Sequence, residues 1–220
     1  MPASLYYYQA TGRANVIRLA LAAANIPFND VYPQGGFPPS DEVKAKWRKL
    51  GGNTTTNVPM LQMEDGKVYT QSQAILRFIG RTGNLMPQNE SDLFLVDKLL
   101  EDAEDLRKES YKCFIPWGAP QESADAFIEK VLPLHLGNLE RQLKESSGEY
   151  FIGDSLTLAD VAVYDAVVNF GSNRVPTALD NFADLKAWKE KVEKNEGIQK
   201  YLNSDAYAGL MKFGPETIGK

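Results

Sequence analysis

The chain has 220 residues, of which 43% are hydrophobic and 10% aromatic, enough to form one large domain or two small ones with a packed core. Its 29 acidic residues outnumber the 24 lysines and arginines, and no basic run occurs, which argues against nucleic acid or an anionic membrane as the main partner. The single cysteine, Cys113, excludes an intrachain disulfide and a CxxC redox centre, and the single histidine, His135, argues against a metal site and a His-dependent triad.

The N-terminus lacks the charged-then-apolar pattern of a signal peptide, and no apolar run has the length of a membrane span. We therefore expect a soluble, cytoplasmic protein with no membrane partner. The first predicted element is a strand over residues 5–8, a β-prone run that ends at a Gln-Ala-Thr-Gly stretch. A buried helix over residues 13–24 connects it to a second strand over residues 28–32, and this connection makes the two strands parallel.

Residues 33–40 contain glycines and prolines and form a predicted loop. A short charged helix over residues 41–50 follows this loop and carries Trp47, Arg48 and Lys49. The helix ends at a Gly-Gly-Asn stretch.

A β-hairpin and a helix complete the N-terminal part. Residues 60–64 alternate apolar and polar, Asp65-Gly66 gives a two-residue turn because glycine adopts a positive φ at no steric cost, and residues 68–70 form the return strand. The helix that follows has an apolar stripe of Ala74, Ile75, Phe78 and Ile79 and packs on the sheet. The order βαβ then ββα predicts a compact α/β sandwich.

The first turn of that helix is a candidate binding site. Unpaired backbone N–H groups and the positive end of the helix dipole favour a carboxylate or phosphate there, beside the Gln71 amide and the Ser72 hydroxyl. Pro59, directly before a strand, leaves two interpretations. A trans proline would begin an edge strand, as most do, whereas a cis proline would turn the Val58 backbone toward a ligand.

Beyond residue 91 every predicted element is helical. Residues 82–91 are polar and lack periodicity, which is typical of a linker. The helix over residues 92–112 has an apolar stripe of Leu95, Val96, Leu99, Leu100, Ala103 and Leu106. A second helix over residues 122–145 contains Pro133, which predicts a kink because the ring removes a hydrogen bond and clashes with the preceding turn.

The last part of the chain predicts three further helices. Thr157 and Asp160 form a capping box that begins a buried helix. Two shorter helices, over residues 182–195 and 197–203, complete the bundle.

Two of these stretches resemble the cytosolic glutathione transferases. The run Val58-Pro59-Met60-Leu61, then Asp65-Gly66, then Gln71-Ser72-x-Ala74-Ile75-Leu76-Arg77 is similar to their N-terminal domain, and the Ile-Gly-Asp-Ser-Leu-Thr-Leu-Ala-Asp-Val run at 152–161 is similar to the capping motif of their helical domain. The resemblance covers essentially the whole chain. It implies a thioredoxin-like domain over residues 1–81 with a cis Pro59, a linker over 82–91 and an all-α helical bundle over 92–220.

The resemblance also selects one of three consecutive tyrosines. In relatives of the alpha, mu, pi and sigma types, a tyrosine five residues before a Gly-Arg pair donates a hydrogen bond to the glutathione sulfur, and Gly12-Arg13 points back to Tyr7. The N-terminal tyrosine together with Gln71-Ser72 looks most like the sigma type, and Thr11 replaces an arginine of some alpha-type relatives. Without the resemblance, a tyrosine in a strand is most often a core or half-buried ring.

The remaining glutathione contacts follow from the same resemblance. Val58 and Pro59 would face the cysteinyl part of glutathione, Gln71 and Ser72 would hold the γ-glutamyl carboxylate, and Asn57 occupies a neighbouring position that is often Gln in relatives. The glycyl carboxylate could meet Trp47, Arg48 or Lys49, and these three stay open. Asp105 would reach the ligand of the partner subunit, which implies a homodimer.

The implied activity is the activation of glutathione, as co-substrate, and its conjugation to hydrophobic electrophiles in detoxification, with peroxidase or isomerase side activity. An electrophile site would form where the first strand ends opposite the first long helix, lined by Tyr8, Tyr111, Phe114, Tyr207 and Phe213. The alternative is a non-catalytic member of the same fold that binds glutathione or other ligands, or serves as a structural protein.

Overall fold

The computed structural model describes residues 2–35, 38–52 and 58–219. A four-stranded sheet has the order β2-β1-β3-β4, from β1 (Ala3–Tyr6), β2 (Phe28–Val31), β3 (Met60–Gln62) and β4 (Val68–Thr70). β1 is parallel to β2, as predicted, and antiparallel to β3, which pairs with β4 as a hairpin. The predicted βαβ-ββα order is therefore confirmed.

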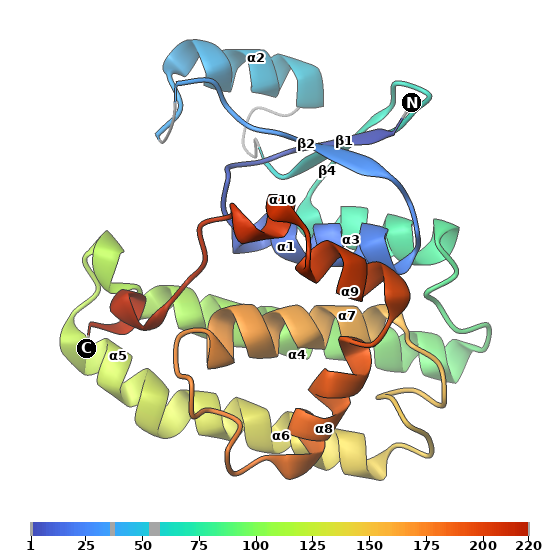
Figure 1. Cartoon of the computed structure of the whole chain (residues 1–220), viewed down its shortest axis with the longest axis vertical. Coiled ribbons are helices and arrows are strands. Elements are labelled where there is room, and N and C mark those ends of the chain that lie inside the picture. The colour runs from blue at the N-terminus through green and yellow to red at the C-terminus, as the bar shows by residue number, and fades with distance from the viewer. Residues whose placement is uncertain (1, 36–37, 53–57, 220) are drawn as a thin grey trace.

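Helices cover both faces of this sheet. α1 (Asn15–Ala23) and α3 (Ser72–Thr82) lie on one face and α2 (Asp41–Gly51) on the other (Figure 1). All residues of α1 except Ala22 are buried, in agreement with the apolar run. A 3-10 turn, Gly12–Ala14, precedes α1.

The first strand differs from the prediction. It begins at Ala3 and ends at Tyr6, because the chain turns after Tyr7, where the Ala10 N–H bonds the Tyr8 carbonyl at 2.7 Å. The Arg18 guanidinium donates to the same carbonyl at 3.4 Å. Tyr7 and Tyr8 therefore lie just beyond the sheet and not in it.

The C-terminal part of the chain is helical. α4 begins at Glu90, where the Asn89 side chain caps it, and α3 ends at Thr82, so the irregular connection is shorter than the predicted linker. In chain order the helices are α4 (Glu90–Lys112), α5 (Gln121–Ala126), α6 (Leu132–Glu145), α7 (Leu158–Asp165), α8 (Ala183–Val192), α9 (Glu196–Leu202) and α10 (Asp205–Ala208). α7 is buried along its whole length and packs on α1 and α4 (Figure 1).

The predicted helix over residues 122–145 is interrupted. A π-helical segment, Phe127–Val131, separates α5 from α6. Pro133 has no N–H to donate to the Glu129 carbonyl, so the ordinary α-helical bond cannot form there. The wider π-helical turn replaces the α-helical one at this point. A second π-helical segment, Ala166–Ser172, extends α7 and contains no proline from which it could be predicted.

The capping box at the start of α7 is confirmed. The buried Asp160 carboxylate accepts hydrogen bonds from the Thr157 N–H at 2.9 Å and from the Thr157 hydroxyl at 2.8 Å. It also accepts from the Phe151 N–H at 3.1 Å and the Trp188 indole at 2.9 Å. One carboxylate therefore joins the start of α7 to the preceding loop and to α8.

A buried chain of polar groups joins the two parts of the protein. The Asn15 amide of α1 donates to the Asp165 carboxylate of α7 at 2.7 Å, and the Tyr201 hydroxyl of α9 donates to the Asn15 carbonyl oxygen at 2.9 Å. Burial raises the pKa of the Asp165 carboxyl to about 7. Asp165 therefore takes up a proton on folding within a physiological pH range.

We predict that this group imposes a pH dependence on stability. The folded pKa lies above the unfolded value of about 3.9, so its contribution is complete below pH 4 and is lost as the pH rises through 7. Between pH 5 and 7 the free energy of unfolding of Asp165→Asn should fall less with rising pH, or rise more, than that of the wild type. Urea unfolding at several pH values measures both slopes. The exposed Glu122→Gln change is the control, and identical slopes for Asp165→Asn and wild type would refute the assignment.

Candidate active site

The ends of three strands meet at one edge of the sheet. Tyr6 of β1 pairs with Met60 of β3, and Met60 pairs with Thr70 of β4. Because β3 is antiparallel to both neighbours, the residues just beyond this row are those that follow β1, precede β3 and follow β4. The three residues are Tyr7, Pro59 and Gln71.

Tyr7 presents a hydroxyl proton at this edge. Its side chain is only 8% exposed, and its hydroxyl oxygen accepts a hydrogen bond from the Arg13 backbone N–H at 3.0 Å. A tyrosine hydroxyl also has one proton to donate. Within residues 2–35, 38–52 and 58–219 this proton has no acceptor. A ligand atom is therefore the partner that the geometry leaves open.

The protonation state of Tyr7 suits a hydrogen-bond donor. Burial raises the pKa of Tyr7, while the Arg13 hydrogen bond and the charges of Arg13 and Arg18 oppose this rise without cancelling it. The hydroxyl therefore keeps its proton at neutral pH.

The close approach of Gly12 to Tyr7 leaves no space for a side chain at position 12. Its φ is +40°, and a Cβ at this position would lie 2.5 Å from the Tyr7 hydroxyl oxygen and 3.0 Å from the ring. A side chain would therefore displace the hydroxyl, and only glycine permits the Arg13 N–H to approach it. This contact accounts for the five-residue spacing between Tyr7 and the Gly12-Arg13 pair.

The neighbouring tyrosines have other contacts. The Tyr6 hydroxyl donates to the Gln62 side chain at 3.0 Å, and its ring meets Trp47 edge-on at 6.2 Å. The Tyr8 ring lies tilted against those of Tyr7, at 5.2 Å, and Trp47, at 6.4 Å. Burial raises the pKa of Tyr8, and the charge of Lys44 opposes this rise.

The start of α3 has an unusual backbone conformation. Gln71 adopts φ 70° and ψ 107°, a conformation that non-glycine residues rarely adopt, and its side chain does not cap the helix. Ser72 is buried in the first turn. The Val58-Pro59 peptide bond is cis, as the resemblance implied. Asn57 lies outside the described residues.

The three α2 residues predicted for the glycyl carboxylate differ in burial. Trp47 is buried against Tyr6, and Lys49 and Trp47 line a cavity of about 660 Å³ between α2 and the sheet. Arg48 is exposed. Lys44, whose charge acts on Tyr8, was missed in the sequence, although its position three residues before Trp47 puts both on one helix face.

An aromatic cluster lies beside Tyr7, across the boundary with the helical part. The Phe213 ring lies 5.1 Å from Phe114 and 5.9 Å from Tyr111, so the structure brings these three predicted residues together. Phe170 and Trp117 join them, with Trp117 stacked on Tyr111 at 5.5 Å. Phe170 and Trp117 were not predicted, because no pattern in the neighbouring sequence indicates that either ring joins this cluster.

Arg13 connects Tyr7 to this cluster. Its backbone N–H bonds the Tyr7 hydroxyl, and its guanidinium lies 5.9 Å from the centre of the Tyr111 ring. Tyr207 is not a member of the cluster. It lies in α10, and its ring packs on Tyr201 at 5.2 Å, apart from the other predicted residues.

Asp105 and its neighbour Glu104 have different surroundings. Asp105 is exposed on α4 and pairs with Lys108 at 3.2 Å. Glu104 is buried, accepts a hydrogen bond from the Gln73 amide of α3 at 3.1 Å and forms an ion pair with Arg107. These contacts fix α4 beside the start of α3.

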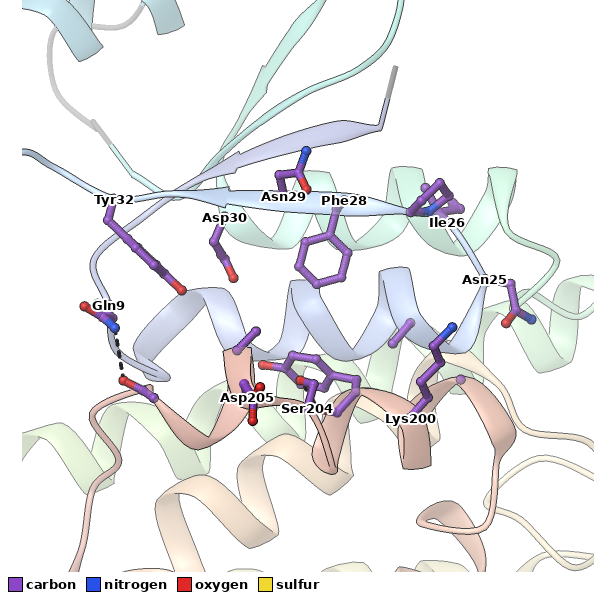
Figure 2. A pocket seen from close by; sticks show the side chains of 16 residues that line it. Gln9, Asn25, Ile26, Phe28, Asn29, Asp30, Tyr32, Lys200, Ser204 and Asp205 are labelled. Carbon is purple, nitrogen blue, oxygen red and sulfur yellow. Dashed lines mark hydrogen bonds between the residues drawn. The ribbon is translucent and has the colours of Figure 1, made fainter.

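A separate cavity of about 680 Å³ lies between β2 and the α9–α10 segment (Figure 2). Phe28 and Asp30 of β2 and Tyr32, which follows it, point into this cavity, and the Gln9 amide donates to the Gly209 carbonyl at 3.2 Å at one end. Asp30 is held by Arg18 at 2.9 Å, so its carboxylate is already paired. The Gln9–Gly209 hydrogen bond joins the segment after Tyr7 to the residue that follows α10.

Membrane-spanning helices and metal-binding clusters are both absent from the described part of the chain. No helix there is long and apolar enough to cross a membrane. The same residues contain no cluster of three or more His, Cys, Asp or Glu side chains that could hold a metal ion.

The fold and the site define a class of protein with a thioredoxin-like sheet domain and a helical domain that meet beside a buried tyrosine. The sequence models described as glutathione S-transferase, N-terminal domain and C-terminal domain match residues 3–81 and 104–205. A glutathione S-transferase of Plasmodium falciparum (isolate 3D7) is 30% identical, with 91% of this chain and 94% of the relative covered. Glutathione S-transferase Mu 3 of Homo sapiens is 32% identical, with 94% and 90% covered. The chain belongs to the glutathione S-transferase family.

Solved structures agree with this assignment. The Pi-class glutathione S-transferase of Onchocerca volvulus superposes with a TM-score of 0.81 at 25% identity, with 96% of each chain covered. The prostaglandin synthase D of Nilaparvata lugens superposes with a TM-score of 0.75 at 20% identity, which shows a shared fold. The thioredoxin-like domain and the helical bundle expected from the sequence are thus confirmed.

We predict that Gly12→Ala destabilises the protein and displaces the Tyr7 hydroxyl. The clash adds to the strain of a positive φ, so the free energy of unfolding should fall by about 1–3 kcal/mol. Gly66→Ala is the matched control, because Gly66 has φ +82° but open space where its Cβ would lie. Urea unfolding compares the two variants, and equal losses would show that the contact with Tyr7 is unimportant.

Proposed function

We propose that this protein is a glutathione transferase that activates the glutathione thiol through Tyr7 and joins it to hydrophobic electrophiles, a detoxification reaction. One observation carries the proposal: the Tyr7 hydroxyl accepts a hydrogen bond from Arg13 and keeps a proton with no acceptor within the described residues. Membership of the family supports glutathione as the co-substrate.

The hydroxyl of Tyr7 would act on the sulfur. A free thiol has a pKa of about 8.5, and a hydrogen bond to sulfur together with nearby helix N-termini that lower it by about two units, roughly 2.7 kcal/mol, make the thiolate dominant at neutral pH. The thiol proton leaves to solvent. The sulfur lone pair then attacks an electrophilic carbon, and either a leaving group departs with its bonding electrons or a conjugate adduct takes a proton from water.

The strand ends would hold the rest of glutathione. The first turn of α3, with Gln71 and Ser72, suits the γ-glutamyl carboxylate, and the backbone at Val58 and Pro59 suits the cysteinyl part. In our proposal Asn57 takes part in this region. For the glycyl carboxylate, Trp47, Arg48 and Lys49 all remain candidates, and Lys44 joins them from the same helix.

The aromatic cluster would bind the apolar part of the electrophile. Tyr111, Phe114 and Phe213 are its predicted members, and the Trp117 ring, 63% exposed, extends it toward solvent. Tyr8 borders the site from the other side of Tyr7. A peroxide or an isomerisable carbon acceptor could take the place of the electrophile, which would give peroxidase or isomerase side activity.

The proposal includes a homodimer and a cytoplasmic location. Phe94 and Leu95 of α4 are 67% and 39% exposed, and such apolar side chains beside each other favour a protein interface. The exposed Asp105 lies on the same helix and could reach the ligand of a partner subunit. In the reducing cytoplasm both glutathione and the buried Cys113 would stay as thiols.

A non-catalytic member of the family that only binds glutathione is the second candidate, since the same site would hold the tripeptide without turning it over. Assay of thiol addition to a chlorinated nitrobenzene separates the two. Saturable turnover supports the enzyme, and glutathione binding without turnover supports the alternative.

We predict that Tyr7→Phe lowers kcat/KM by about 10- to 150-fold, the value of a charge-assisted hydrogen bond of about 1.5–3 kcal/mol. The ring is kept, so its packing persists. Tyr8→Phe is the matched control and should stay close to wild type, because its hydroxyl does not receive the Arg13 N–H. A loss in Tyr8→Phe with none in Tyr7→Phe would overturn the assignment.

We predict that Asp105→Ala raises the Kd for glutathione several-fold, because the dimer loses a carboxylate that reaches the partner's ligand. Glu101→Ala, one turn earlier, should not, since its partner Arg77 keeps Asp97 at 2.7 Å. Calorimetric titration measures both affinities, and light scattering measures the mass. An active monomer at the assay concentration would refute the shared site.

A further inference from the structure

Arg174 is a buried cation with no acidic partner in the described ranges. It follows the π-helical segment Ala166–Ser172 and is 2% exposed. Burial lowers the pKa of its guanidinium, as expected for a charge removed from water. Such a group is tolerated inside a protein only when its donors are fully used.

Neutral acceptors from two distant segments use these donors. At the end of α4, one terminal nitrogen donates to the Ser110 carbonyl at 2.6 Å and hydroxyl at 2.5 Å, and the other donates to the Cys113 carbonyl at 3.1 Å. In the last turn of the chain, Nε donates to the Thr217 hydroxyl at 2.9 Å and a terminal nitrogen to the Thr217 carbonyl at 3.2 Å. The planar fork of arginine therefore joins the end of α4 to the C-terminal segment.

The C-terminal segment has a second anchor near Tyr7. The Met211 N–H donates to the Gln9 carbonyl at 3.0 Å, and the Thr11 N–H donates to the Met211 carbonyl at 2.9 Å. The segment thus runs from the residues after Tyr7 to the C-terminal end of α4 (Figure 1). Between the two anchors lies Phe213, whose ring completes the aromatic cluster.

Arg174 also contacts the cluster itself. Its guanidinium carbon lies 5.7 Å from the Phe114 ring centre and 5.5 Å from that of Phe127. Phe114 is the residue against which Phe213 packs edge-on. A role limited to capping α4 would need the bonds to Ser110 and Cys113 but not those to Thr217, which lies 43 residues away in sequence.

We propose that Arg174 is a positioning residue that fixes the segment from Met211 to Thr217, so that Phe213 closes the electrophile site and sets the affinity for apolar substrates. Arg174 touches no substrate. The inference rests on the proposed function, because it assigns the aromatic cluster to the electrophile.

Arg174→Lys tests this directly, because lysine keeps the charge but has three donors on one nitrogen and no fork. We expect the KM for a chlorinated nitrobenzene to rise roughly 3- to 10-fold, the scale of a lost aromatic contact, while kcat and the KM for glutathione stay close to wild type. Arg141→Lys, at an exposed arginine paired with Glu145, is the matched control. A change in thermal stability with all three kinetic constants unaltered would refute the proposal.

A double-mutant cycle identifies the residue through which Arg174 acts. If Arg174 positions Phe213, then Arg174→Lys adds little to the KM effect of Phe213→Ala. Fully additive effects on KM would refute this coupling. If Arg174→Lys does not fold, Thr217→Val removes the hydroxyl acceptor at the other end and should produce the same KM change.

Two measurements without turnover separate this proposal from the proposed function. Calorimetry compares the Kd values of glutathione and S-hexylglutathione, and hydrogen exchange follows the amides of the C-terminal segment. Wild type that binds neither ligand would refute the proposed function. Faster hydrogen exchange at the Met211 and Phe213 amides in Arg174→Lys would still support the positioning role of Arg174. Unchanged exchange, together with an unchanged ratio of the Kd for S-hexylglutathione to the Kd for glutathione, would refute that role.

Discussion

The register of β1, β3 and β4 is the constraint on which the rest of the site depends. The paired row of Tyr6, Met60 and Thr70 fixes which residues lie beyond it, so a tyrosine, a cis proline and the first turn of a helix meet although they are far apart in sequence. A shift of one residue in either pairing would turn the side chains to opposite faces and disperse the site. Gly12 completes the arrangement, because it lets the following backbone N–H reach the Tyr7 hydroxyl.

Buried polar contacts hold the helical part against this edge. Asn15 joins α1 to Asp165 of α7, and Arg18 joins α1 to Asp30 of β2 and to the carbonyls that follow Tyr7. The aromatic cluster is therefore held beside the tyrosine through α1, with Arg13 in contact with both. The candidate site lies between a sheet edge and a helix end, and buried polar bonds connect both to α1.

Much of this could be predicted from the sequence, because local patterns specify it. The Asp65-Gly66 hairpin, the Thr157–Asp160 capping box and the disturbed helix at Pro133 each depend on a few neighbouring residues. What could not be predicted depends on tertiary contacts. The packing of Phe170 against Phe213 and the bonds of Arg174 to Thr217 each join residues 43 positions apart. The packing of Tyr207 on Tyr201, and not beside Phe213, is a tertiary contact of the same kind, since the sequence does not reveal which rings a side chain contacts.

The central claim is that this edge of the sheet stabilises a thiolate. Ultraviolet titration of glutathione bound to the wild-type protein measures the pKa of its thiol directly, through the absorbance of the thiolate. Our account predicts a midpoint about two units below the free value of about 8.5. A midpoint at or above the free value would contradict it, because neither the Tyr7 hydroxyl nor the helix N-terminus would then stabilise the charged sulfur.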